Sequence, residues 1–158
     1  MGWVESLQGT VVGLDTSPII YYIEEKAAYV KVVDPFFEAI RRGEISVVTS
    51  VISLLEVLVY PMETRDLELA QRYRNILLRS RGLRIVDTNQ EIAEEAARLR
   101  AFHNIRTPDS IQMATAIKMN ATYFLTNDLK LPSLPELKVL KLDELKTLPE
   151  YLEPDNSH

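Results

Sequence analysis

The sequence predicts an α/β fold, an α/β/α sandwich in which helices cover both faces of a central, mostly parallel sheet of four to five strands. Short β-rich runs alternate with longer segments of helical periodicity, which is the βαβ pattern of a parallel sheet. The chain has 158 residues, of which 46% are hydrophobic, and this is enough to build a substantial core. We therefore expect one domain over residues 1–147. A tail with two prolines, residues 148–158, is expected to be extended or disordered.

Five apolar runs are the predicted strands, and they cover residues 11–15, 45–50, 83–87, 122–126 and 137–141. The segments between them carry apolar residues at helical spacing, namely IIYYIEE, VDPFFEAIRR, VISLLEVLVY, LELAQRYRNILLRS, EIAEEAARLRAFH and DSIQMATAIKM. Ligands of such sheets bind outside the carboxyl ends of the strands. A polar residue that ends a strand is therefore a candidate site residue.

Capping residues predict where several of these helices begin. Ser17 and Thr107 each precede a proline, which suits the first turn of a helix; Ser17 can therefore be an N-cap, and Thr107 is expected to be one. Thr88 and Glu91 have the spacing of a capping box. Asp87, which ends the third predicted strand, is therefore interpreted as a polar residue at the start of the next helix rather than as a ligand.

Composition and charge exclude several classes of protein. The chain has no cysteine, so it can form neither a disulfide nor a thiolate metal site. Its net charge of −5 counts mildly against a nucleic-acid partner, unless bound metal ions and a local basic patch supply positive potential. The N-terminus does not resemble a signal peptide, and residues 45–62 divide into a β-rich half and a helical half that contains Glu56. We expect a soluble, cytoplasmic protein without a membrane span.

Two acidic residues in the first half of the chain stand in unusual settings. Asp15 ends the apolar run VVGLD, where it could simply support the start of the next helix. Glu56 is the only charge between Glu44 and Glu63, in a helix with apolar residues around nearly its whole circumference. A carboxylate in such a setting must be paired, metal-bound or protonated, and a salt bridge to an arginine is the structural alternative.

Two further acidic residues follow in the second half. Asp109 lies in the first turn of the helix near Thr107, where a surface acid would also suit the helix dipole. Asp128 follows the apolar strand YFLT, and a plain turn would have the same sequence. In a doubly wound sheet, Asp15, Glu56, Asp109 and Asp128 could converge on one crevice.

A cluster of four carboxylates predicts a divalent metal site. Carboxylates packed together repel one another and become protonated unless a cation is present. Ligands that are all oxygen suit Mg²⁺ or Mn²⁺, which support the hydrolysis of phosphodiesters. His103 near a predicted helix end and the terminal His158 have no partners for a zinc site. Arg106 could either pair with an acid or hold a phosphate.

Four motifs follow one another along the chain, namely GLDTSPIIYYIE, TSVISLLEVL, TPDSIQMATAI and YFLTND. Together and in this order they resemble the PIN-domain ribonucleases, particularly the VapC-type toxins of toxin–antitoxin pairs. The resemblance extends from about Val11 to about Leu140. It implies an α/β/α fold and an endoribonuclease that cuts single-stranded RNA with Mg²⁺ or Mn²⁺. The matching acids are Asp15, Glu56, Asp109 and Asp128. The family's supporting hydroxyls correspond to Ser17, two residues after the first acid, and to Thr126, before the last acid.

The resemblance also implies partners, namely a second copy of the chain in a homodimer and a small antitoxin protein. A group of arginines could contact the RNA backbone or form an ordinary solvated helix face, and its members are Arg72, Arg74, Arg79, Arg81 and Arg84. The pairs Tyr21–Tyr22 and Phe36–Phe37 are expected in the core or at a helical interface.

Other functions remain open from the sequence. An RNA-processing nuclease without a toxin role would share the same site. A receiver-type phosphoacceptor domain would require adjacent acids after the first strand, where Asp15 is followed by Thr16, and a haloacid-type phosphatase would require an aspartate at Ser17. A catalytically silent metal- or RNA-binding module is the remaining alternative.

Overall fold

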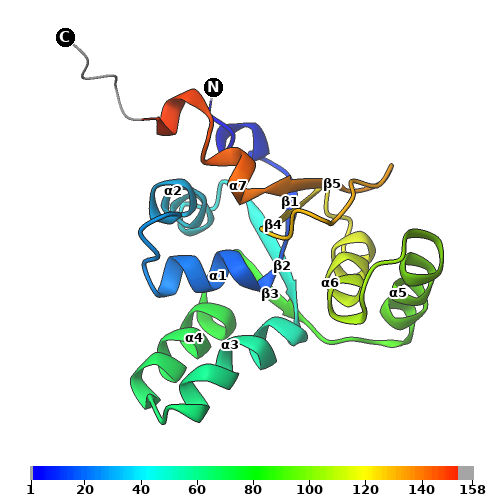
Figure 1. The fold of residues 1–158 in the computed structure, drawn as a ribbon, viewed down its shortest axis with the longest axis horizontal. Helices are drawn as coiled ribbons and strands as arrows, with labels where there is room; N and C mark the ends of the chain where they lie inside the picture. Colours follow the sequence, from blue (N-terminus) through cyan, green and yellow to red (C-terminus); the bar gives the residue numbers. More distant parts are fainter. Residues whose placement is uncertain (1, 153–158) are drawn as a thin grey trace.

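The structure, a computed structural model, describes residues 2–152, and within them it contains a central sheet of five strands. Figure 1 shows this sheet between the helices. The strands are β1 (Val11–Leu14), β2 (Ser46–Ser50), β3 (Leu83–Val86), β4 (Tyr123–Thr126) and β5 (Lys138–Lys141). Their order across the sheet is β3-β2-β1-β4-β5, and every neighbouring pair is parallel. The predicted α/β/α fold is confirmed, with all five predicted strands present.

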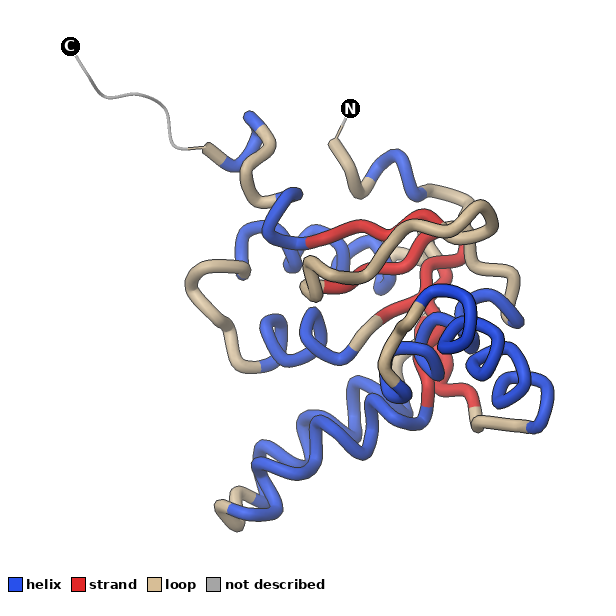
Figure 2. Tube along the Cα trace, turned by 45° about the vertical axis from the view of Figure 1, so that its right-hand side comes forward, coloured by secondary structure: helices blue, strands red, loops and turns tan. Residues whose placement is uncertain are grey.

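Helices cover both faces of this sheet (Figures 1 and 2). One layer contains α1 (Thr16–Ile23), α2 (Val30–Arg41), α3 (Val51–Glu63) and α4 (Leu67–Arg79), and the other contains α5 (Gln90–His103) and α6 (Thr107–Lys118). The short helix α7 (Leu142–Leu145) follows β5. The hairpin of α3 and α4 extends away from the sheet. None of the helices within residues 2–152 is long and apolar enough to cross a membrane.

Two apolar clusters, one on each face, hold the layers together. Val12 and Leu14 of β1 contribute to the cluster beneath α1, α2 and α4, whereas Phe124 of β4 contributes to the cluster beneath α5 and α6. Gly13 lies between them in β1, and a Cβ atom built there would lie 2.4 Å from Cβ of Ala116 on α6. The missing side chain therefore allows α6 to approach the sheet closely.

β1 is the strand at which the direction of winding reverses, because β2 lies on one side of it and β4 on the other. In open parallel sheets such a switch point forms a crevice at the carboxyl ends of the strands. Asp15 follows β1 directly, and its backbone N–H donates to the carbonyl of Leu125 in β4 at 2.9 Å. The fold thus brings the first candidate acid to the place where ligands of such sheets bind.

Two predicted caps of the helices nearest this edge are wrong. Asp15, rather than Ser17, is the N-cap of α1, and its side chain accepts a hydrogen bond from the N–H of Thr16. The N-cap position of α6 belongs to Arg106, and Thr107 is the first helical residue. An aspartate competes well for the N-cap position, so it takes precedence over a serine two residues later.

The predicted capping box before α5 is also wrong. Asn89 is the N-cap of this helix, and its side chain accepts from the N–H of Ile92. The helix begins at Gln90, one residue too late for Thr88 to cap it. Asparagine is at least as strong an N-cap as threonine, which accounts for the shift.

The aromatic pairs are confirmed as packing residues. Phe36 and Phe37 are buried, and the ring of Tyr22 stacks on that of Phe37 with centroids 4.1 Å apart. Tyr21 stacks in the same way on Tyr29. Within the predicted tail, residues 149–151 form a short 3₁₀ helix, while residues 153–158 lie outside the described part of the chain.

Candidate metal centre

Asp15 lies at the centre of the candidate site and has both carboxylate oxygens hydrogen bonded. Oδ1 accepts from the backbone N–H of Thr16 at 2.8 Å, and Oδ2 accepts from Oγ1 of Thr126 at 2.7 Å. Burial, with smaller contributions from the nearby Asp109 and Glu56, raises the pKa of Asp15 from 3.8 to about 6, although both hydrogen bonds oppose the rise. The site therefore holds this carboxylate at an energetic cost when it is ionised.

Thr126 connects Asp15 to Asp128. Its buried hydroxyl donates to Asp15 and accepts from the backbone N–H of Asp128 at 3.0 Å. Oδ1 of Asp128 accepts in turn from the N–H of Lys130 at 3.0 Å, which fixes the turn after β4. The threonine that precedes the last acid thus lies directly between two candidate ligands.

Asp109 and Asp128 share a single arginine. Nη2 of Arg106 lies 3.3 Å from Oδ2 of Asp109 and 3.9 Å from Oδ2 of Asp128. Burial raises the pKa of Asp109, and the charge of Asp128 raises it further, while Arg106 opposes both effects. The side chain of Arg106 is 81% exposed, so most of its donors face solvent. The pairing that the sequence left open is therefore present, and it leaves the guanidinium accessible.

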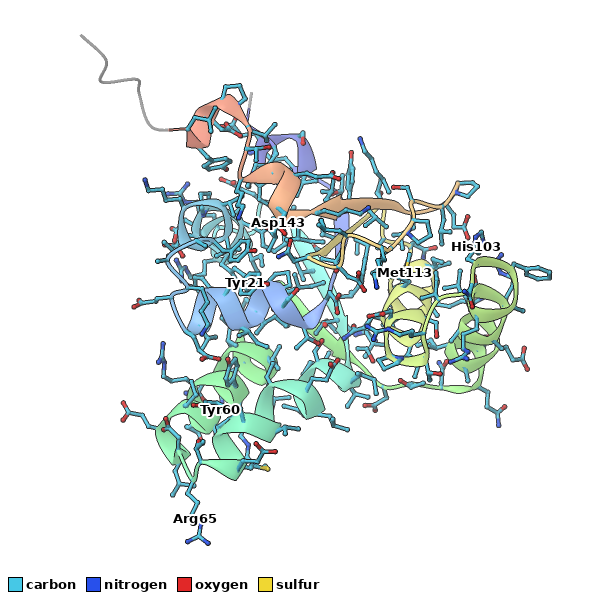
Figure 3. The ribbon with its side chains drawn as sticks, viewed as in Figure 1. Tyr21, Tyr60, Arg65, His103, Met113 and Asp143 are labelled. Carbon is cyan, nitrogen blue, oxygen red and sulfur yellow. The ribbon has the colours of Figure 1, made fainter. Side chains whose placement is uncertain are left out.

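Glu56 lies in a different environment from the one predicted. We expected apolar residues around nearly the whole of α3, but Glu56 is exposed, and so are Leu55 at 60%, Val59 at 46% and Tyr60 at 59%. The prediction of a buried carboxylate is wrong because no described segment packs on this side of α3. The hairpin that carries it extends outwards, with Arg65 at its tip (Figure 3). Among residues 2–152, the hydrogen-bond partner of Glu56 is Thr16, whose Oγ1 donates to Oε1 at 3.0 Å.

A continuous series of contacts therefore joins the four predicted acids. Glu56 contacts Thr16, which adjoins Asp15; Thr126 then connects Asp15 to Asp128, and Arg106 connects Asp128 to Asp109. The Ser17 side chain makes no hydrogen bond within the described part of the chain, whereas the hydroxyl of Thr16, next to the first acid, bonds to Glu56.

The donor chemistry of these residues fits a hard divalent cation. All the candidate ligands are carboxylate oxygens, and the raised pKa values of Asp15 and Asp109 reflect repulsion and burial that a cation would relieve. No three carboxylate or imidazole groups within residues 2–152 stand close enough together to hold an ion as they are arranged. Binding would therefore require the carboxylates to draw together, and the exposed Arg106 side chain has the freedom to move aside.

A groove of about 470 Å³ opens beside Asp109 and Asp128. Its wall includes the cationic side chains of Arg106 and Lys130. His103 also lines it, at the end of α5 as labelled in Figure 3. His103 is exposed in the last turn of that helix, as predicted, and no described carboxylate pairs with it. The groove gives the acidic site a local positive border despite the net negative charge of the chain.

The sequence analysis missed Thr16 and Gln112 as residues of this site. Gln112 on α6 is 2% exposed, and its Nε2 lies 3.4 Å from Oγ1 of Thr16. A signal was present in both cases. Thr16 immediately follows the candidate acid, and Gln112 is the polar residue one turn after Asp109 in the apolar helix DSIQMATAI.

Comparison with known structures identifies relatives of this fold. The structure of VapBC2 from Rickettsia felis bound to a DNA fragment from its promoter contains a chain that matches with a TM-score of 0.66 and 21% identity, over 83% of this chain and 98% of that one. A toxin–antitoxin complex from Klebsiella pneumoniae matches with a TM-score of 0.61 and 22% identity, over 82% and 95% of the two chains. DNA-bound VapBC from Salmonella typhimurium matches with a TM-score of 0.61 and 17% identity, over 84% and 98%.

Comparison with curated protein sequences gives no significant match. The model of one protein family, described as the PIN domain, matches residues 12–137, which include most of β1, all of β4 and all four candidate acids. This match covers most of the chain, and the fold agrees with it. The protein therefore belongs to the PIN-domain family.

Proposed function

We propose that this protein is a Mg²⁺-dependent endoribonuclease that cuts single-stranded RNA in the cytoplasm as the toxin of a toxin–antitoxin pair. The observation that carries the proposal is the set of four carboxylates at the switch point of the sheet. There, burial and neighbouring acids raise the pKa of Asp15 to about 6. Membership of a nuclease family and the likeness to VapBC complexes support it.

Asp15, Glu56, Asp109 and Asp128 would hold Mg²⁺ or Mn²⁺. Such an ion supplies an activated water molecule and stabilises the charge that develops on the phosphate. The residues of the chain provide the geometry, because Thr126 and the N–H of Thr16 orient the two oxygens of Asp15. Glu56 and Asp109 approach from helices on opposite faces of the sheet.

Arg106 and Lys130 would contact the phosphates of the substrate. Both line the groove beside Asp109 and Asp128, and the exposed guanidinium of Arg106 retains donors for a phosphate oxygen. This border would offset the repulsion between an acidic protein and RNA.

We also propose that the chain forms a homodimer and binds a small antitoxin. The Klebsiella pneumoniae structure is a toxin–antitoxin complex and the Rickettsia felis structure is VapBC2 bound to promoter DNA, which supports the antitoxin part of the proposal. Light scattering on the purified protein would measure its molar mass, and purification with its neighbouring gene product would test for the partner. A monomer that purifies alone would contradict the proposed assembly without affecting the proposed nuclease.

The direct test is cleavage of a mixed-sequence single-stranded RNA with Mg²⁺, with Mn²⁺ and with EDTA. We expect cleavage with either metal, none with EDTA, and a loss of at least about 100-fold in Asp15→Asn, because it removes a charged ligand. Asp87→Asn is the matched control, since Asp87 follows the end of β3 as Asp15 follows β1 but is exposed and outside the cluster. Equal cleavage by Asp15→Asn and the wild type would contradict the proposal.

A further inference from the structure

Four buried polar side chains form a connected cluster where α1, β2, α3 and α6 meet, and it contacts Glu56 through Thr16. They come from α1, β2, α3 and α6, and none is more than 6% exposed. The members are Thr16, Thr49, Ser53 and Gln112. Every buried side-chain nitrogen and oxygen in the described part of the chain has a hydrogen-bond partner. A buried cluster of this kind is costly unless each donor and acceptor is matched, so its hydrogen-bond directions can be worked out.

The directions follow from counting hydroxyl protons. Thr49 Oγ1 donates its single proton to the carbonyl oxygen of Leu14 at 2.7 Å. In the 2.7 Å bond between Thr49 and Ser53, Ser53 must therefore be the donor. Thr16 gives its proton to Oε1 of Glu56. Both hydroxyl protons are then used, so no proton remains for the 3.3 Å contact between Thr16 and Ser53. Each of these two oxygens can still accept a hydrogen bond from a third group.

Gln112 provides both missing donors. Its Nε2 carries two protons and lies 2.7 Å from Oγ of Ser53 and 3.4 Å from Oγ1 of Thr16. Its Oε1 accepts from the backbone N–H of Ser50 at 3.2 Å. The opposite orientation of the amide would place an NH₂ group against that N–H, so the hydrogen-bond network determines which way the amide points.

We propose that Gln112 is a positioning residue that holds Glu56 in the site by acting through Thr16. Glu56 is exposed on a helix that extends from the sheet, and the Thr16 hydroxyl is its one hydrogen-bond partner within residues 2–152. Gln112 occupies a lone pair of Thr16 and so directs the threonine proton towards the carboxylate. Loss of a side chain that orients a metal ligand in this way typically lowers metal affinity by about 10- to 100-fold. This inference rests on the proposed function, because that function makes Glu56 a metal ligand.

Two measurements on purified protein test this role. The first is the χ1 rotamer population of Glu56 in metal-free protein, from NMR three-bond couplings. We expect one dominant rotamer in the wild type and in Thr16→Ser, which keeps the hydroxyl, and averaging in Thr16→Val and Gln112→Leu. The second is Mn²⁺ binding by calorimetry, where Thr16→Val and Gln112→Leu should each bind on the order of tenfold more weakly.

A double variant separates positioning from a general loss of structure. If Gln112 acts through Thr16, then Thr16→Val with Gln112→Leu binds Mn²⁺ no more weakly than Thr16→Val alone. Thr115→Val is the matched control, because its buried hydroxyl on α6 bonds only to Ile111 of the same helix. We expect this control to keep the wild-type rotamer and affinity.

The outcomes distinguish this inference from the proposed function. If Gln112→Leu leaves the Glu56 rotamer fixed, or if its effect on Mn²⁺ affinity adds fully to that of Thr16→Val, the positioning role is overturned. If the wild type binds no Mn²⁺, the proposed function fails, and the rotamer measurement alone then decides whether Gln112 positions Glu56.

Discussion

The two sides of the acidic site are built differently. On the side of α1, α3 and α6, the hydroxyls and amide around Thr16 and Gln112 are buried and fully hydrogen bonded. On the side of the groove, Asp109 and Asp128 are connected by one arginine whose side chain is 81% exposed. Buried networks resist rearrangement, whereas exposed ion pairs contribute little and break easily. The comparison indicates a site with one preformed side and one that can adjust to a ligand.

The largest expected effect on stability concerns Asp15, which lies between the two sides. Its pKa is raised from 3.8 to about 6, so the folded protein binds this proton more tightly than the unfolded chain. The neutral Asp15 carboxyl therefore contributes to the free energy of unfolding below pH 3.8, and this contribution is lost as the pH rises through about 6. The loss amounts to roughly 3 kcal/mol. Asp15→Asn should therefore raise the free energy of unfolding of metal-free protein at pH 7 by up to that amount.

Denaturant unfolding across this pH range measures the effect. The gain in Asp15→Asn should shrink towards zero as the pH falls below 3.8, because the wild-type carboxyl is then neutral in both states. A variant that is less stable than the wild type at neutral pH would show that the two hydrogen bonds to Asp15 outweigh its burial. The raised pKa of the metal-free protein also predicts that Mn²⁺ binds more tightly as the pH rises through about 6, because the metal competes with the Asp15 proton.

Gly13→Ala should cause the next largest effect, on the buried side. The new Cβ would lie 2.4 Å from Cβ of Ala116, so α6 must move away from β1. Overpacking of this kind costs about 1–3 kcal/mol, and the shift would also displace Gln112 and Asp109. Thermal unfolding measures the loss. An unchanged melting temperature would mean that α6 is not held tightly and that the preformed side is less rigid than we describe.

Ser53→Ala tests the buried network itself. The change leaves one proton of Gln112 without an acceptor, which costs about 1–3 kcal/mol in a buried site. Ser110→Ala is the control, because the Ser110 hydroxyl is also buried but donates only to the carbonyl of Thr107 in its own helix. We expect a smaller loss in the control. Equal losses in urea unfolding would indicate that the network has no special role in stability.

The smallest effect on stability is expected for Arg106→Gln on the open side. An exposed ion pair contributes at most about 1 kcal/mol, so unfolding should change little. Mn²⁺ should bind more tightly, because the substitution removes the guanidinium that competes with the metal for the oxygens of Asp109 and Asp128. Single-stranded RNA should bind more weakly, with a shallower dependence on salt.

The control for this variant is Arg42→Gln, which removes an exposed arginine paired with Glu38 on α2, outside the acidic cluster. RNA binding and Mn²⁺ affinity are both measured by calorimetry. If the two variants behave alike, the groove beside Arg106 is not a phosphate-contacting surface.

Much of this arrangement could be predicted from the order of the motifs. Alternating apolar and helical segments predicted the parallel sheet, and acids at strand ends and helix starts predicted one shared edge, because parallel strands place their carboxyl ends together. The helix caps were less accurate. Asp15 and Asn89 displaced the predicted Ser17 and Thr88, since neighbouring capping residues differ by only a fraction of a kilocalorie per mole.

The sequence by itself determined the fold class and the strands and singled out the four acids that we propose as metal ligands, because periodicity and strand-end chemistry are local properties. Only the tertiary structure decided that Glu56 is exposed, that Arg106 connects Asp109 to Asp128, and that Gln112 reaches Thr16. Helical periodicity records which residues are apolar but not which of them another segment covers. Contacts between helices that are far apart in the chain depend on how the layers pack, and that information is absent from any local pattern.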